Sequence, residues 1–441
     1  MRKLVSIVLC LSVLAVFAFT LSASAASNPP SDYFIDEAKL PFDPLPGATA
    51  YWGVHKNAGY RVEVPENWNG DLVIYCHGYR GTGTELTVGN PSIRNYLILH
   101  GFAWAASSYS TNKYDVKAGV KDSHALGKFF NGLVKKPNRV YVIGHSMGGH
   151  VTAKIIEQYP GAYDGALPMC GVMGDTELYD YFLSFQLVAQ ALAGIDAQFP
   201  SPPEPDWSAI VAYMRSQFGQ SEAAPFPYYL SPLGEKLATI VKYLSGGERP
   251  LFDYSFRYGY YANYVLGTNF GDGSRDVAAG NVMENIDTIY QLDGDPALTP
   301  EEEAINDMVL RVVADPQGKH PNGLANIPVV KGNPTIPVIS LHTIGDMYVP
   351  FLMQQLYAER VIANGKEDLV VFRVVRDSGH CGFKIEEQEV AFGDLVNWVE
   401  NGVVPAGDDV LSPAVVASPD YGCTFTSVQR SYDISIYTCP E

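Results

Sequence analysis

Short apolar runs alternate with segments of helical periodicity in the first part of the chain, up to about residue 171. Strands are predicted at 60–64, 71–76, 102–107, 139–143 and 164–169. A helix is predicted over 115–134, where apolar side chains recur every three or four residues, and another follows residue 149. Strands and helices in alternation are typical of an α/β fold, in which helices flank both faces of a mostly parallel central sheet.

This alternation stops near residue 171 and resumes with a β-branched apolar run at 336–341. The block between them predicts helices at 232–244 and 300–314. The second helix opens with Thr299-Pro300-Glu301-Glu302, which supplies a capping residue, a proline at the first position and acids in the first turn. We interpret 172–334 as a mainly helical cap inserted after the strand at 164–169, which we count as the sixth strand of the fold. A tandem domain is less favoured, because the sheet pattern resumes beyond it.

The remainder of the sheet pattern follows the cap. A helix is predicted at 348–364, a strand at 369–375 and a last helix at 385–400. The sheet domain of the α/β fold is therefore assigned to 26–171 and 335–403. Residues 404–441 form a C-terminal extension that contains prolines and glycines.

The first 25 residues have the organisation of an export signal. Met1-Arg2-Lys3 is basic, 4–21 is apolar, and Ala23-Ser24-Ala25 provides small residues for cleavage. We predict a signal peptide, 1–25, and a secreted or periplasmic protein. A retained membrane anchor is less favoured, since the apolar run is borderline for spanning a bilayer.

Charge restricts the range of partners. The chain has 30 basic and 48 acidic residues, for a formal net charge of −18. Nucleic acids and anionic membrane surfaces would repel such a surface. The sequence therefore predicts no nucleic-acid partner and, after signal cleavage, no membrane association. It does not determine the oligomeric state.

Five cysteines follow the predicted signal, and an exported protein favours disulfides. Cys423 and Cys439 bracket a short strand-like tail and are predicted to pair. The other three, Cys76, Cys170 and Cys381, are odd in number, so at least one is unpaired or pairs between chains. Their spacing fits no zinc site.

The sequence Gly144-His145-Ser146-Met147-Gly148 follows the predicted strand 139–143 and precedes a predicted amphipathic helix. A serine in this G-x-S-x-G pattern lies on a sharp turn between a strand and a helix. The small residues on either side permit the strained backbone that such a turn requires. The pattern predicts that Ser146 is an exposed nucleophile.

A serine hydroxyl is a weak nucleophile and needs a base that a third group orients. Asp346 lies in the loop after the strand 336–341, and His380 lies in a loop of small residues after the strand 369–375. Both loops should open at the carboxyl end of the sheet, where Ser146 is also expected. Asp377 is a less favoured acid, because it is so close to His380 in the sequence.

With these residues in the order Ser, Asp, His, the chain resembles the α/β-hydrolase superfamily over about 27–171 and 335–403. The resemblance implies that Ser146 is the nucleophile, His380 the general base and then acid, and Asp346 the orienting carboxylate. His77-Gly78-Tyr79 looks like the oxyanion loop of the family, which implies that the backbone N–H groups of Tyr79 and Met147 bind the oxyanion. It implies no metal or organic cofactor.

Other histidines and the aromatic residues of the cap have weaker claims to function. His77 is expected to shape the oxyanion loop, and His145, His150 and His342 to pack or form hydrogen bonds. The aromatic segment 252–261 is a candidate wall of the substrate pocket. Packing within the cap, or between the cap and the sheet, is the simpler interpretation of that segment. The candidate substrate-binding residues in it are Tyr254, Tyr258 and Tyr261.

The leading hypothesis is a secreted serine hydrolase that cleaves carboxylic esters through an acyl-enzyme, with a small-molecule or polymeric ester as substrate. The alternative is a secreted peptidase or amidase, aminopeptidase-like, with the same three residues. A third hypothesis is a binding protein on a hydrolase scaffold, because fold does not fix function. The intact Ser, Asp and His set argues against this last one.

Overall fold

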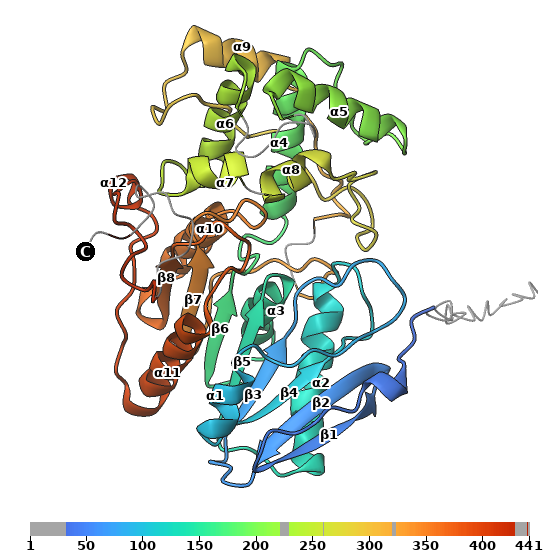
Figure 1. Cartoon of the computed structure of the whole chain (residues 1–441), viewed down its shortest axis with the longest axis vertical. Coiled ribbons are helices and arrows are strands. Elements are labelled where there is room, and N and C mark those ends of the chain that lie inside the picture. The colour runs from blue at the N-terminus through green and yellow to red at the C-terminus, as the bar shows by residue number, and fades with distance from the viewer. Residues whose placement is uncertain (1–31, 221–228, 259, 320–322, 428–438, 440–441) are drawn as a thin grey trace, which may run out of the picture. The chain divides into compact units, whose positions relative to one another are not determined.

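One eight-stranded sheet forms the centre of the computed structural model, which describes residues 32–220, 229–258, 260–319, 323–427 and 439 (Figure 1). The strand order is β1-β2-β4-β3-β5-β6-β7-β8. β1 and β2 are antiparallel to their neighbours, and all the other pairs are parallel. The strands are β1 (Ala48–His55), β2 (Ala58–Pro65), β3 (Leu72–Cys76), β4 (Ala103–Ser107), β5 (Val140–His145), β6 (Gly165–Met169), β7 (Val338–Thr343) and β8 (Val370–Val375).

Side chains of the sheet alternate between two cores. Leu72, Ile74 and Val142 belong to one core, together with α2 (Val116–Leu133) and α3 (Met147–Gln158). Their sequence neighbours Val73, Tyr141 and Ile143 belong to the other, together with α1 (Arg94–Leu99) and α11 (Ile385–Asn401). α10 (Leu352–Ala363) packs into the first core through Met353 and Tyr357. The predicted α/β fold, with helices on both faces of a mostly parallel sheet, is confirmed.

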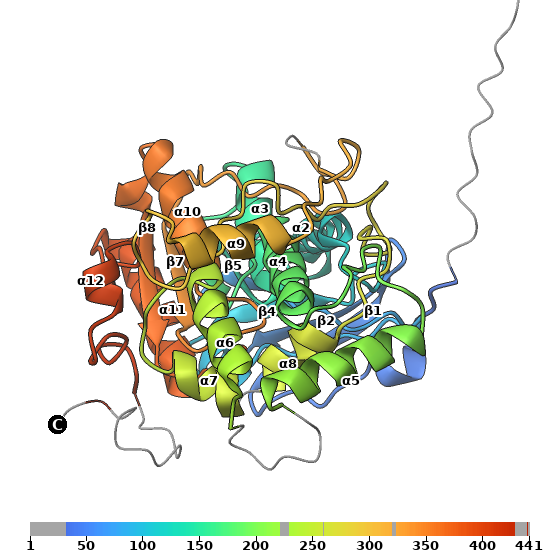
Figure 2. The ribbon, with the colours of Figure 1, turned by 90° about the horizontal axis from the view of Figure 1, so that it is seen from above.

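The segment between β6 and β7 contains the cap helices, which lie above the sheet in Figure 1 and are seen from above in Figure 2. The insertion follows the sixth strand, as the sequence predicted. The helices are α4 (Glu177–Leu192), α5 (Asp206–Phe218), α6 (Pro232–Leu244), α7 (Phe252–Tyr258), α8 (Tyr260–Gly267) and α9 (Pro300–Met308).

Two local predictions differ from the structure. β1 is not predicted from the sequence; it is an edge strand whose apolar side chains Trp52 and Val54 are 44% exposed. The helix predicted at 300–314 ends at Met308, although its capping box at Thr299 is present. Beyond Met308 the chain is held by Asn285 instead, whose backbone N–H donates to the carbonyl oxygen of Val312 and whose side-chain Oδ1 accepts from the N–H of Val312. These side-chain and loop contacts are non-local and leave no periodic signal.

Beyond β8 and α11, the described chain includes a short helix, α12 (Pro413–Val416), and Cys423 forms the predicted disulfide with Cys439. Two short 3-10 helices, η1 (Glu37–Lys39) and η2 (Glu367–Leu369), complete the elements. The predicted signal peptide, 1–25, lies outside the described residues. No helix within the described ranges is long and apolar enough to cross a bilayer.

A buried ion pair fixes the start of the sheet. Glu63 on β2 is fully buried and accepts hydrogen bonds from Arg94 Nε at 2.6 Å and Nη2 at 2.7 Å. Trp104 Nε1 on β4 donates to the same carboxylate at 2.7 Å, and the backbone N–H of Leu45 donates at 2.6 Å. One carboxylate therefore joins β2, β4, α1 and the N-terminal segment.

Replacing this carboxylate should destabilise the fold. In Glu63→Gln, Arg94 keeps its charge but loses its anionic partner in a site that excludes water. We expect the free energy of unfolding to fall by about 3 kcal/mol, measured by urea denaturation. Glu235→Gln is the matched control, because it breaks the exposed pair with Arg257 and should have little effect. Equal losses in the two variants would contradict the role given to Glu63.

Candidate active site

Ser146 lies on the sharp turn between β5 and α3, with φ 58° and ψ −123°. A positive φ is unfavourable for a serine and is retained only where the surroundings impose it. Here the close approach of the backbone imposes it. A side chain at Gly144 would collide with the carbonyl group of Gly148, and one at Gly148 with that of Cys76. The turn is therefore built from the two glycines that the sequence pattern singled out.

The structure brings Ser146, His380 and Asp346 together in one chain of hydrogen bonds. His380 Nε2 lies 2.8 Å from Ser146 Oγ, and His380 Nδ1 lies 2.5 Å from Asp346 Oδ2. Asp346 is fully buried, and its Oδ1 accepts from the N–H groups of Tyr348 and Val349 at 2.9 Å each. The carboxylate is thus fixed on one side and orients the imidazole on the other. The serine hydroxyl then donates to Nε2, which is the arrangement a general base requires.

Asp377, the less favoured acid, has a different place. Its Oδ1 accepts from the N–H of Gly379 at 2.7 Å, within the loop that carries His380. Both ring nitrogens of His380 are occupied by Asp346 and Ser146. The contacts therefore give Asp377 a role in the shape of the loop.

The predicted oxyanion loop lies beside the serine. A Cβ atom at Gly78 would be 3.3 Å from Ser146 Cβ, so the backbone passes very close to the nucleophile. Within the described chain, no acceptor receives a hydrogen bond from the backbone N–H of Tyr79 or of Met147. Two such amides beside a nucleophile suit an oxyanion. Their assignment to the oxyanion hole stays a prediction.

Four further histidines are buried, and burial lowers the pKa of each. The pKa is about 3 for His77 and about 4 for His145, His150 and His342. His77 stacks on Tyr109 with ring centroids 3.9 Å apart and contacts the carbonyl oxygens of Gly78 and Ser108. His150 and His342 contact the carbonyl oxygens of Pro328 and Val349, and His145 contacts the amide of Gln388. These neutral rings are packed and hydrogen-bonded.

A disulfide that the sequence left open lies next to the catalytic candidates. Cys170 directly follows β6, Cys381 directly follows His380, and the two are joined. The sulfur of Cys381 lies 3.5 Å from His380 Nε2. The two sulfurs and His380 form a potential metal-binding cluster, but sulfurs bonded to each other are not thiolate ligands. Cys76 is the free thiol, and burial raises its pKa to about 11.

A cavity of about 310 Å³ opens beside the nucleophile. Tyr348 meets the ring of His380 edge to face at 5.4 Å, and Tyr264 of α8 meets Tyr348 in the same way at 5.3 Å. The cap thus contributes to the wall of the cavity through Tyr264. The lining residues are Gly78, Tyr79, Ser146, Tyr264, Tyr348, His380 and Cys381.

Two of the aromatic residues that the sequence proposed for substrate binding, Tyr254 and Tyr258, are not among the described residues that line this cavity. They stack on each other at 4.6 Å, one helical turn apart on α7. The side chain of Tyr261 lies outside the described part of the structure. A binding role for these three residues stays a prediction. Tyr348, which the sequence placed only in a helix, could have been suspected from its position two residues after Asp346.

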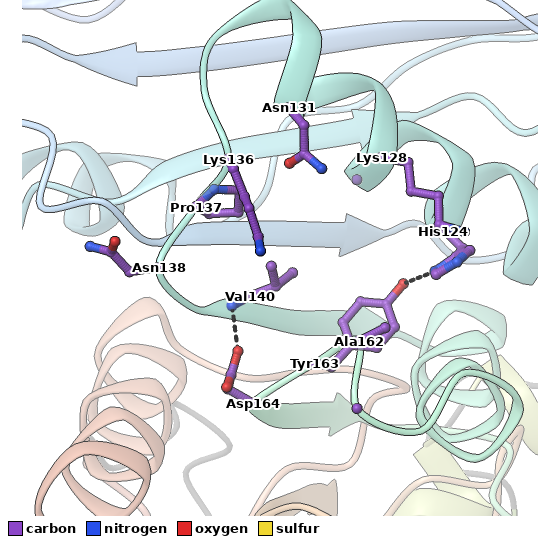
Figure 3. Close-up of a pocket in the computed structure, with 12 residues that line it drawn as sticks. His124, Lys128, Asn131, Lys136, Pro137, Asn138, Val140, Ala162, Tyr163 and Asp164 are labelled. Carbon is purple, nitrogen blue, oxygen red and sulfur yellow. Dashed lines mark hydrogen bonds between the residues drawn. The ribbon is translucent and has the colours of Figure 1, made fainter.

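A second cavity, of about 340 Å³, lies where β5 and β6 begin, away from the nucleophile (Figure 3). His124 of α2 reaches the hydroxyl of Tyr163 at 3.2 Å, and Asp164 accepts from the N–H of Val140 at 2.8 Å. Ser146 lies at the other end of β5, and none of the three triad candidates is among the described residues that line this second cavity.

The strand order, the strained turn at Ser146 and the order Ser, Asp, His along the chain all indicate the same fold. The chain has the α/β-hydrolase fold. Its constellation is that of a serine hydrolase of the α/β-hydrolase type.

No family model matches this chain. An o-phthalyl amidase of Xanthobacter agilis is 23% identical over 420 residues, covering 82% of this chain and 89% of the relative. Feruloyl esterase B from Aspergillus oryzae has a TM-score of 0.46 at 16% identity, with 81% of this chain and 82% of that chain covered. The acylaminoacyl peptidase of Pyrococcus horikoshii has a TM-score of 0.40 at 10% identity, with 83% and 44% covered.

The two acids near His380 can be separated by mutation. In Asp346→Asn the amide can no longer accept from His380 Nδ1–H with a full charge, so the wrong tautomer is favoured. We expect kcat for an ester to fall by about 10³- to 10⁴-fold. Asp377→Asn preserves the acceptor for Gly379 and should leave kcat nearly unchanged. The reverse order of effects would identify Asp377 as the acid.

The two disulfides provide a second matched pair. In Cys170→Ser/Cys381→Ser the loop of His380 is no longer tied to β6, so the imidazole should lose alignment with Ser146. We expect kcat to fall by about 10- to 100-fold, since small displacements of a catalytic group are costly. Cys423→Ser/Cys439→Ser removes the remote disulfide and should leave kcat unchanged. An unaltered kcat in the first variant would contradict the positioning role.

Proposed function

We propose that this protein is a secreted serine hydrolase that cleaves carboxylic esters through an acyl-enzyme. The observation that supports it is the unbroken hydrogen-bond chain from Ser146 through His380 to the buried Asp346. The aromatic walls of the adjacent cavity suit an ester with a bulky or aromatic group. The substrate is a small-molecule or polymeric ester of this kind.

In the first half of the proposed reaction, Ser146 Oγ attacks the ester carbonyl while His380 Nε2 takes the hydroxyl proton. Asp346 stabilises the resulting imidazolium. The backbone N–H groups of Tyr79 and Met147 receive the oxyanion, and each such donor lowers the barrier by about 3 kcal/mol. His380 then passes its proton to the departing alcohol, which leaves the acyl group on Ser146.

In the second half, water takes the place of the alcohol. His380 Nε2 removes a proton from the water as its oxygen attacks the acyl carbonyl. Collapse of the second tetrahedral intermediate breaks the bond to Ser146, whose oxygen recovers the proton from His380. The products are the free acid and the starting enzyme.

Amide hydrolysis is the second candidate, and the likeness to an o-phthalyl amidase favours it. The same steps serve an amide, because His380 can protonate a departing amine as it does an alcohol. Ester and amide cleavage differ in the leaving group that the cavity accepts. The tyrosine walls suit an aromatic acyl group in both cases.

Export is part of the proposal. Two disulfides suit an oxidising compartment. The basic and apolar organisation of 1–25 supplies the signal that would deliver the chain there. The acidic net charge suits a protein that acts without nucleic-acid or membrane partners.

A substrate series tests the assignment. p-Nitrophenyl esters of increasing acyl length and aryl amides should be offered to wild type and to Ser146→Ala. Loss of the nucleophile should lower kcat by about 10⁴-fold or more. Retained ester and amide turnover in Ser146→Ala would rule out the serine mechanism. Amide turnover that exceeds ester turnover would move the assignment to an amidase.

A further inference from the structure

Arg275, in the cap loop that follows α8, is a partly buried cation without an anionic partner. Its guanidinium packs over the rings of Phe270 at 5.0 Å and Tyr179 at 5.2 Å. Its Nε is buried and has no hydrogen-bond partner, and no carboxylate of the described residues forms an ion pair with it. The hydroxyl of Tyr179 is the polar group that it approaches.

An arginine whose guanidinium donates no hydrogen bond is unusual within the described part of the chain. Every other described arginine donates at least one hydrogen bond through its guanidinium. Arg249, which is more deeply buried, donates to the carbonyl oxygens of Ile344 and Gly247 and to Ser245 Oγ. A buried donor such as Nε of Arg275 is unfavourable while it has no acceptor. The exception at Arg275 therefore indicates a ligand.

Arg275 lies close to the cavity beside Ser146. Its ring partner Phe270 stacks on Phe182 at 5.4 Å, and Phe182 stacks on Tyr348 at 5.5 Å. Its charge also acts directly on two residues of the cavity wall, because it opposes the rise in pKa that burial imposes on Tyr79 and Tyr348. The described residues of the cavity wall include no lysine or arginine.

The nearest negative charge does not neutralise it. Asp276 follows Arg275 in the chain, is exposed, and forms no ion pair with it. Its backbone N–H is held by Ser274 Oγ. The guanidinium meanwhile packs on two aromatic rings, so less side-chain freedom would be lost when a ligand binds.

We propose that Arg275 binds a carboxylate on the acyl group of the substrate, so that the enzyme prefers monoesters or monoamides of aromatic dicarboxylic acids. A guanidinium matches a carboxylate through two parallel hydrogen bonds. The aromatic ring of such an acid would lie between the tyrosine walls, with its second carboxylate directed away from Ser146. This inference rests on the proposed function and names the substrate class of the same site.

The test compares the butyl monoesters of the three benzenedicarboxylic acids with butyl benzoate. At least one charged ester should show a kcat/KM about 10-fold or more above that of the neutral ester. In Arg275→Met, which keeps an unbranched side chain between the rings, that kcat/KM should fall by about 10- to 100-fold, because a hydrogen-bonded charge is lost. The fall should come mainly from KM. Turnover of butyl benzoate should change little.

Two controls separate charge recognition from a general effect on the cap. Arg275→Lys keeps the charge and should recover part of the preference. Arg257→Met removes a cap arginine that pairs with Glu235 and should leave all four esters unaffected. Equal turnover of the four esters by wild type, or an equal loss on butyl benzoate in Arg275→Met, would overturn the inference while leaving the esterase proposal intact.

Binding to the wild type supplies a readout that does not need turnover or a variant. Phthalate, isophthalate and terephthalate are titrated by calorimetry beside benzoate, and at least one dianion should bind about 10-fold more tightly. If no ester is cleaved but a dianion binds in this way, the proposed function fails and the anion site stands. If benzoate binds as tightly as the three dianions, the inference fails.

Discussion

The fully buried carboxylate of Asp346 is the constraint on which the site depends. A charge with no access to water must be matched by hydrogen-bond donors, and the structure supplies three of them. Two are backbone amides just beyond β7, at Tyr348 and Val349, and the third is His380 Nδ1. The amides are fixed by the fold, so the direction of the second carboxylate oxygen is fixed as well. The imidazole must lie where that oxygen is, and Ser146 completes the line.

The sheet makes this alignment possible because β5, β6, β7 and β8 are neighbours and parallel. Each contributes one residue where it ends or just beyond: Ser146, Cys170, Asp346 and His380 follow the four strands in that order. The loop after β8 is at the edge of the sheet that the described residues form. The disulfide from Cys170 to Cys381 ties that loop back across two strand spacings. The disulfide therefore compensates for the position of this loop at the edge of the sheet.

The features that could be predicted from the sequence are those that depend on residues close together in the chain. The serine turn, the loops of Asp346 and His380 and most strands are signalled within a few residues, and the structure has them close to the predicted positions. The edge strand β1 was missed because its exposed apolar residues break the alternation on which strand prediction rests. The partner of Cys381 is 211 residues away in sequence, and no spacing rule reaches that far. The role of Tyr264 as a cavity wall depends on how α8 meets the loop after β7, which is a tertiary contact.

Aromatic composition does not by itself identify the wall of a pocket. In the aromatic segment 252–261, α7 stacks Tyr254 on Tyr258. The same cap contains Arg275, whose neighbours in sequence give no hint of function. Aromatic rings contact its guanidinium, and no carboxylate of the described residues forms an ion pair with it. In a chain with 48 acidic residues, an arginine beside the active-site walls without an acidic partner is more informative than any local motif of the cap. The sheet domain specifies acyl transfer, and the charges that the cap leaves unmatched are where the choice of acyl group should be sought.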